Sequence, residues 1–194
     1  MAHKIGTICM LLGAALVTAA LSLFVCNQWE NRHADEAAAE AMTQVAAHIA
    51  TAETAEPDTD ATEMTETEID GYTYIGYLSI PSEGLDLPVM SSWSYDQLKV
   101  APCRYYGSTK TNDLVIAGHN YTRHFGPIGN LVPGDMLRFT DMDGVTTTYE
   151  VAEVDVLNPT AIEEMTDSGF ALTLFTCNYS GQARVTVRCN RVLK

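Results

Sequence analysis

Hydrophobic residues follow three different patterns along the 194-residue chain. An uncharged apolar run covers residues 5–25, long enough at 1.5 Å per residue to reach about 30 Å across a bilayer's hydrocarbon core. Residues 30–70 are polar and hold few large hydrophobic side chains. From Gly71 onward, short β-type runs alternate with turn residues. The pattern predicts a cytoplasmic tip with a transmembrane anchor (1–29), an extracellular stalk (30–70) and a folded domain (71–194).

The apolar run is expected to remain as a single-pass anchor in the cell membrane. Lys4 precedes it, which favours a cytoplasmic N-terminus and an extracellular domain. A cleaved signal peptide has the same basic start and apolar core. This run is long for such a core, however, no clear small-x-small site closes it, and Phe24-Val25 before Cys26 fits a lipoprotein cleavage site poorly. An uncleaved anchor is therefore the favoured interpretation.

The stalk carries most of the charge. Residues 30–70 contain 12 of the 25 acidic side chains and one of the 11 basic ones, so the net charge of −14 belongs mainly to this segment. Residues 34–50 are rich in Ala and Glu and favour a helix, but without a broad stripe of large apolar residues a packed core helix is not expected. Residues 51–70 are predicted to be mobile, and the two segments together form a spacer. A chain this acidic is not expected to bind nucleic acid.

The pattern of residues 71–194 predicts a domain made mainly of β-strands. Its many short strands and closely spaced turns indicate a sandwich or barrel rather than alternating βαβ units, and a short helix is expected over residues 94–100. The predicted strands cover residues 72–80, 85–90, 113–120, 136–140, 145–157, 171–177 and 184–192.

Three of the five cysteines, Cys103, Cys177 and Cys189, belong to the domain, whereas Cys9 and Cys26 lie in or at the end of the apolar run. Three thiols cannot all pair, so at least one is free in a monomer. A free thiol outside the cell is exposed to oxidation, which makes it a candidate functional group.

Cys177 is the first candidate, because it ends a strand beside the polar loop that starts at Asn178. Its thiolate would be a nucleophile, although a lone strand cysteine is more often simply buried. Cys189 shares a strand face with Val185 and Val187, which predicts a buried structural thiol.

Two histidines compete for the role of general acid and base. His119 follows an apolar strand and the small pair Ala117-Gly118, and His124 lies in the next loop. On the last strand, parity turns Arg184 away from the core, where its guanidinium could hold a developing oxyanion or a substrate carbonyl. Considered alone, either histidine is more often a surface residue.

Together these residues resemble the sortases, the cysteine transpeptidases of Gram-positive cell surfaces. Residues 173–177, TLFTC, resemble the T-L-x-T-C signature of that family, and residues 76–81 and 85–89 resemble its opening strands. His119, Cys177 and Arg184 follow one another in the order of the family's histidine, cysteine and arginine. The resemblance covers about residues 72–192.

The resemblance implies a closed, sortase-type eight-stranded β-barrel with short helices. It implies Cys177 as nucleophile, His119 as general acid and base, Arg184 as stabiliser of the oxyanion and Thr176 in support. The expected activity is cleavage of an LPxTG-like C-terminal sorting motif of surface proteins and their transfer to an amine of a peptidoglycan precursor or a pilin. No cofactor or metal is implied.

Two departures bear on the subclass. Residues 101–107, APCRYYG, stand where many sortases have G-P-G-H-[FY]-P-G, and only residues 178–183 separate the cysteine from the arginine. The short loop resembles class D and some class B-like sortases more than class A, and no calcium site carries over. The unusual Cys103 is expected near the active-site side.

Two other functions remain open at this point. A cysteine peptidase could use the same residues with water as acceptor, although a papain-like peptidase fits worse because its cysteine precedes its histidine. A membrane-tethered adhesion or wall-binding β-domain without activity would instead require Cys177 to be buried and unreactive.

Overall fold

The computed structural model describes residues 2–52 and 63–193. The chain forms two compact units, Met1–His33 and Ala34–Lys194, and helix α1 (Ala2–Ala52) contributes to both. Within the described residues, one helix is long and apolar enough to cross a membrane; its most apolar window has a mean hydropathy of 2.5 and is not buried.

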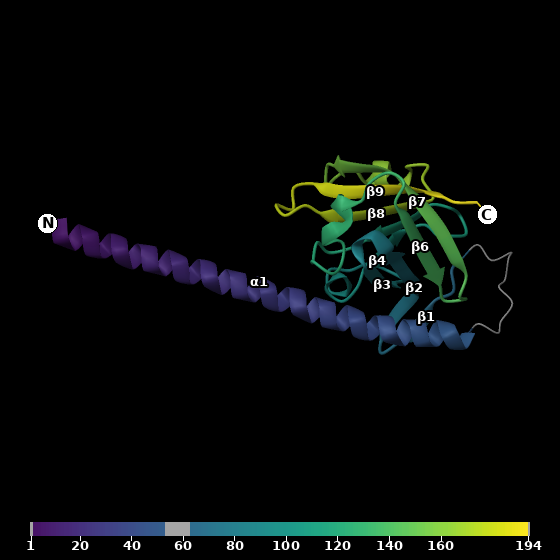
Figure 1. Ribbon diagram of the computed structural model, residues 1–194, viewed down its shortest axis with the longest axis horizontal. Coiled ribbons are helices and arrows are strands. Elements are labelled where there is room, and N and C mark those ends of the chain that lie inside the picture. Colours follow the sequence, from purple (N-terminus) through teal and green to yellow (C-terminus); the bar gives the residue numbers. More distant parts are fainter. Residues whose placement is uncertain (1, 53–62, 194) are drawn as a thin grey trace. The chain divides into compact units, whose positions relative to one another are not determined.

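The second unit is a closed β-barrel, as predicted (Figure 1). Eight strands follow one another in the order β2-β3-β4-β5-β8-β9-β7-β6, pairing of β6 with β2 closes the ring, and the short β1 pairs with β2 as well. Two neighbouring pairs, β3–β4 and β5–β8, are parallel. The strands are β1 (Thr67–Ile69), β2 (Tyr72–Ile80), β3 (Leu85–Met90), β4 (Cys103–Tyr106), β5 (Leu114–Ala117), β6 (Met136–Asp141), β7 (Thr146–Leu157), β8 (Leu172–Cys177) and β9 (Arg184–Arg191).

Closure of the barrel depends on a glycine. Gly76 pairs with Val89 of β3 and with Asp141 of β6. Its φ is +143°, and a Cβ at this position would lie 2.1 Å from the backbone oxygen of Thr140. Only glycine tolerates this conformation and this approach, so β2 can join the two ends of the sheet at Gly76.

Most of the barrel agrees with the sequence pattern. All seven predicted strands are present, and the helix expected over residues 94–100 is the 3₁₀ turn η2 (Gln97–Lys99). Strand β4 was not predicted, because it is only four residues long and includes the charged Arg104. The remaining short helices are η1 (Pro81–Glu83), η3 (Gly126–Asn130) and α2 (Ile162–Thr166).

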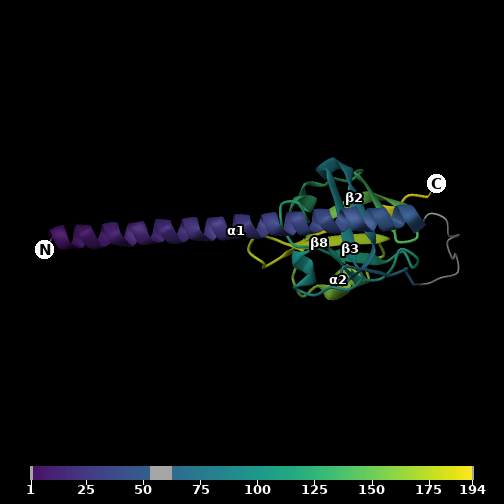
Figure 2. The same cartoon turned by 90° about the horizontal axis from the view of Figure 1, so that it is seen from below.

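The expectation that residues 34–50 would not pack is wrong. This part of α1 runs along the barrel (Figure 2) and buries one side against it. The small alanine side chains let the helix approach the barrel closely, so a stripe with only two larger side chains is sufficient for the helix to pack. The buried residues recur every three or four positions: Ala34, Ala38, Ala41, Val45 and Ile49.

The predicted mobile segment over 51–70 lies partly outside the described residues, which omit 53–62. The rest of it is ordered by the barrel. Met64 is buried in the barrel core, and β1 pairs with β2 through Thr67, Glu68 and Ile69.

Truncation of the helix stripe should destabilise the second unit. Val45 is fully buried, so Val45→Ala should lower the free energy of unfolding by about 2 kcal/mol through lost apolar burial and a residual cavity. Urea unfolding of the full chain in detergent micelles measures this change. Thr43→Ala, at an exposed position of the same helix, is the matched control and should change stability by less than about 0.5 kcal/mol. Equal stability of the Val45→Ala variant and the wild type would contradict the observed packing.

Candidate active site

The parallel pairing of β5 and β8 brings His119 and Cys177 to one edge of the barrel. Ala117 is opposite Phe175 in the register, and the Gly118 amide donates to the Phe175 carbonyl at 3.0 Å. His119 follows Ala117 by two residues, as Cys177 follows Phe175. Because the carboxyl ends of parallel strands meet at the same edge, both side chains leave the sheet at the same level.

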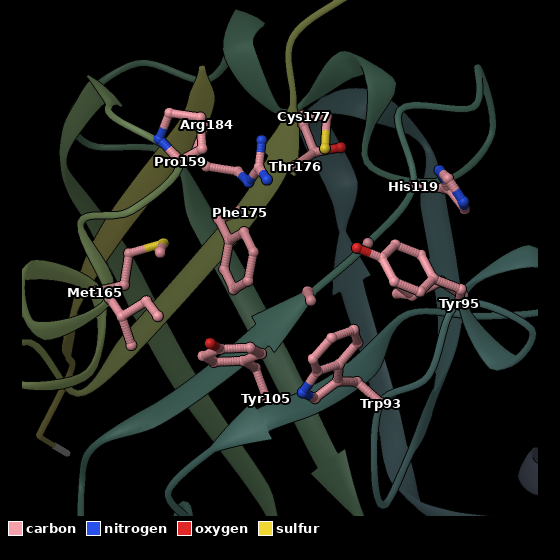
Figure 3. Close-up of a pocket in the computed structure, with 14 residues that line it drawn as sticks. Trp93, Tyr95, Tyr105, His119, Pro159, Met165, Phe175, Thr176, Cys177 and Arg184 are labelled. Carbon is pink, nitrogen blue, oxygen red and sulfur yellow. The ribbon is translucent and has the colours of Figure 1, made fainter. Parts of the chain in front are cut away.

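Arg184 joins them from the other side of β8. It is directly opposite Cys177 in the antiparallel β8–β9 register. The strand order β5-β8-β9 therefore places the cysteine between the histidine and the arginine, and Figure 3 shows this arrangement. All three residues line one pocket, and the sequence-based grouping of these residues agrees with the geometry.

The floor of this pocket is aromatic. Phe175 of β8 meets Tyr105 of β4 edge-to-face with ring centroids 5.2 Å apart, and Trp93 lies 5.7 Å from both Tyr105 and Tyr95. Offset and edge-to-face contacts of this kind hold rings in fixed orientations. The sequence did not point to Trp93 and Tyr95 as pocket residues, because they lie in a loop far along the chain from Cys177. A tryptophan in a serine-rich loop, one of two tryptophans in the chain, was a signal that could have suggested a binding role.

The β7–β8 connection forms a second wall of the pocket. Pro159, Ile162 and Met165 line it, two of them from the short helix α2. Met165 is buried in the same apolar cluster as Phe175, whereas Ile162 is half exposed. The pocket is therefore mainly apolar, with Cys177, His119 and Arg184 as its polar rim.

His119 is held by its own loop. Its imidazole stacks on the ring of Tyr121 with centroids 4.7 Å apart and planes inclined by 29°. The preceding Gly118 packs against the buried Phe125, because a Cβ on Gly118 would lie 2.5 Å from that ring. The small residues Ala117 and Gly118 before His119 thus allow the loop to pack closely. Tyr121 is a neighbour of His119 that the sequence did not single out.

His124, the competing histidine, is not among the residues that line the pocket. Its side chain is fully buried, and its Nε2 lies 3.4 Å from the Ala34 carbonyl oxygen. Burial lowers the pKa of His124 to about 4, because the desolvated imidazolium is disfavoured. His124 is thus a neutral packing residue, and His119 remains as the histidine of the pocket.

The three domain thiols differ in exposure. Cys103 and Cys189 are buried, and desolvation raises the pKa of each thiol to about 12. Cys189 lies in the barrel core, as strand parity predicted, and Cys103 in the outer apolar cluster. Cys177 is partly exposed and lines the pocket, which argues against an inert adhesion domain with a buried cysteine. Among the described residues, no three His, Cys, Asp or Glu side chains form a group suited to a metal ion.

Thr176 also lines the pocket, but its hydroxyl is turned away from solvent. Strand alternation places Thr176 on the side of the core residue Leu174, opposite to Cys177. Its Oγ1 is buried, and the described residues offer it no hydrogen-bond partner.

A family model described as the sortase domain matches residues 78–192. This match covers more than half of the chain, which therefore belongs to the sortase family. Over 124 residues the chain is 30% identical to sortase A of Bacillus anthracis, a match that covers 61% of this chain and 59% of that protein.

Solved sortase structures share the fold. Sortase C1 of Streptococcus agalactiae matches with a TM-score of 0.56 and 24% identity, covering 66% of this chain and 72% of its own. Clostridium perfringens sortase C, solved with the C-terminal cell wall sorting motif, matches with a TM-score of 0.54 and 23% identity, covering 80% of this chain and 91% of its own. These relatives carry different class names, so assignment to class D or a class B-like group stays a prediction.

The buried neutral His124 should make stability depend on pH. Its pKa is about 4 in the folded chain against a usual 6.5, so between these values the unfolded chain binds a proton that the folded chain does not. The free energy of unfolding should therefore fall as the pH drops from 6.5 to 4, by up to about 3 kcal/mol. Denaturant titrations at several pH values should show a flatter profile for His124→Phe. His48→Phe, at an exposed histidine, should keep the wild-type profile; identical profiles for all three proteins would contradict this role of His124.

Proposed function

We propose that this protein is a membrane-anchored cysteine transpeptidase that cleaves an LPxTG-like sorting motif and transfers the surface protein to an amine. The observation that carries the proposal is the meeting of Cys177, His119 and Arg184 at one edge of an apolar pocket. Family membership supports the same chemistry.

In the first half-reaction, the Cys177 thiolate attacks the carbonyl carbon of the motif's threonine, whose peptide bond to the next residue is then cleaved. Arg184, on the adjacent strand, donates to the oxyanion of the tetrahedral intermediate. His119 gives a proton to the departing amine as the peptide bond breaks. A thioacyl bond between the substrate and Cys177 remains.

In the second half-reaction, an amine of a peptidoglycan precursor or a pilin attacks the thioacyl carbon. His119 accepts the proton of that amine, and Cys177 leaves as a thiolate. Water as acceptor would give hydrolysis with the same residues. Product analysis with and without an added amine separates the two outcomes.

The aromatic floor fits the recognition of apolar side chains in a sorting motif. Clostridium perfringens sortase C was solved with such a motif, and its shared fold supports the assignment of this pocket as the substrate site. Because the Thr176 hydroxyl is buried, we assign the supporting role of Thr176 to the packing of β8 behind Cys177 rather than to a bond with the oxyanion.

We place the enzyme in the cell membrane, with residues 1–29 as cytoplasmic tip and single-pass anchor. The apolar stretch of α1 supports this placement, and Lys4 supports a cytoplasmic N-terminus. Residues 30–70 then connect the anchor to an extracellular catalytic domain over 71–194, and the helix from Ala34 and strand β1 within this segment pack on that domain.

Cys177→Ala should abolish product formation, because no thioacyl-enzyme can form. The measurement is mass spectrometry of the full chain incubated with a fluorogenic LPxTG-type peptide and an amine, which detects both the thioacyl adduct and the transfer product. Cys103→Ala removes a buried thiol outside the reacting group and is the control expected to retain both signals. Transfer or cleavage that persists in Cys177→Ala would overturn the assignment.

Arg184→Gln should lower kcat about a hundredfold or more, as expected when one oxyanion donor is lost. Arg184→Lys keeps the charge but not the planar fork, so its activity should lie between that of Arg184→Gln and the wild type. Steady-state kinetics with the same peptide measure both variants. If Arg184→Gln changed KM alone, the arginine would bind the substrate without stabilising the transition state.

A further inference from the structure

The β7–β8 connection, residues 158–171, must be held in place by contacts other than strand pairing. It supplies Pro159, Ile162 and Met165 to the pocket, yet it belongs to no strand of the barrel. Met165 is buried in the outer apolar cluster and fixes one side of the connection. The helix within it has only five residues, too few to be stable by itself.

Arg188 reaches this connection from the barrel wall. It lies on β9, on the same face as Arg184, and its side chain is only 14% exposed. Its Nη1 is 2.7 Å from Glu153 Oε1 and 3.5 Å from Asp155 Oδ2, both on the neighbouring strand β7. These two carboxylates hold the guanidinium in place.

The other side of the same guanidinium contacts the connection. Nη2 donates to the Glu164 carbonyl of α2 at 3.2 Å, and the guanidinium carbon lies 5.7 Å from the centre of the Phe170 ring. A planar group with several donors and a flat face can make all of these contacts together, whereas a lysine ammonium cannot.

We propose that Arg188 is a positioning residue that fixes the substrate-binding wall of the pocket without contacting the substrate. It joins two points of the connection, Glu164 in α2 and Phe170 near its C-terminal end, to the rigid strand β7. Loss of Arg188 removes these contacts and leaves Glu153 and Asp155 as neighbouring like charges. The inference rests on the proposed function, because it assumes that the pocket receives the sorting motif.

The test compares Arg188→Gln with Arg191→Gln in the full chain. Arg191 is on the same strand but bonds to Thr109 and Asn112, away from the pocket. Hydrogen–deuterium exchange over residues 158–171 should be about tenfold faster in Arg188→Gln, and KM for the sorting peptide should rise about tenfold with kcat within about twofold. Arg191→Gln should change neither quantity, and Arg188→Lys should restore them only in part.

The outcomes separate the inference from the proposed function. Unchanged exchange over 158–171 in Arg188→Gln, or equally faster exchange in every strand, overturns the positioning role even if the enzyme is active. Absence of turnover by the wild type contradicts the proposed function, and the exchange comparison then decides the inference by itself. If Arg188→Gln does not fold, Glu153→Gln removes the shortest ion pair from the other side and should produce the same local increase in exchange; no increase overturns the proposal.

Discussion

The register between the parallel strands β5 and β8 is the constraint on which the site depends. It sets Ala117 opposite Phe175, and His119 and Cys177 follow at equal distance. A shift of one residue would turn one of the two side chains to the other face of the sheet. The antiparallel pairing with β9 then adds Arg184 opposite Cys177. One central strand thus determines the relative placement of all three groups.

The outer face of β8 contributes to a second apolar layer outside the barrel core. Phe175 points outward between the pocket and the barrel wall and belongs to a cluster that includes Met165 of α2 and Val45 of the α1 segment. The floor of the pocket and the packing of helix residues 34–52 therefore share one apolar layer. Because buried layers are close-packed, the buried side chains of this helix segment and those beneath the pocket constrain one another.

The sequence predicted what depends on local pattern and missed what depends on tertiary contact. Seven strands had clear periodicity, and the order of His119, Cys177 and Arg184 pointed to their common site. The packed helix was missed because its stripe is made mostly of alanines. Only burial separates His124 from His119, and no local pattern brings Trp93 and Tyr105 together beneath Cys177.

Arg184 and Arg188, on the outer face of β9, have different partners and therefore different proposed roles. Arg188 is paired with Glu153 and Asp155, so most of its charge is already neutralised and it serves to hold structure. In the part of the chain that the structure describes, Arg184 has no carboxylate partner and donates only to the Gly181 and Ala183 carbonyls. A developing oxyanion is stabilised most by a cation whose charge is not already paired. In the proposed mechanism, Arg184 beside Cys177 therefore keeps an unpaired charge for the oxyanion, whereas Arg188, four residues further along the same strand face, holds structure.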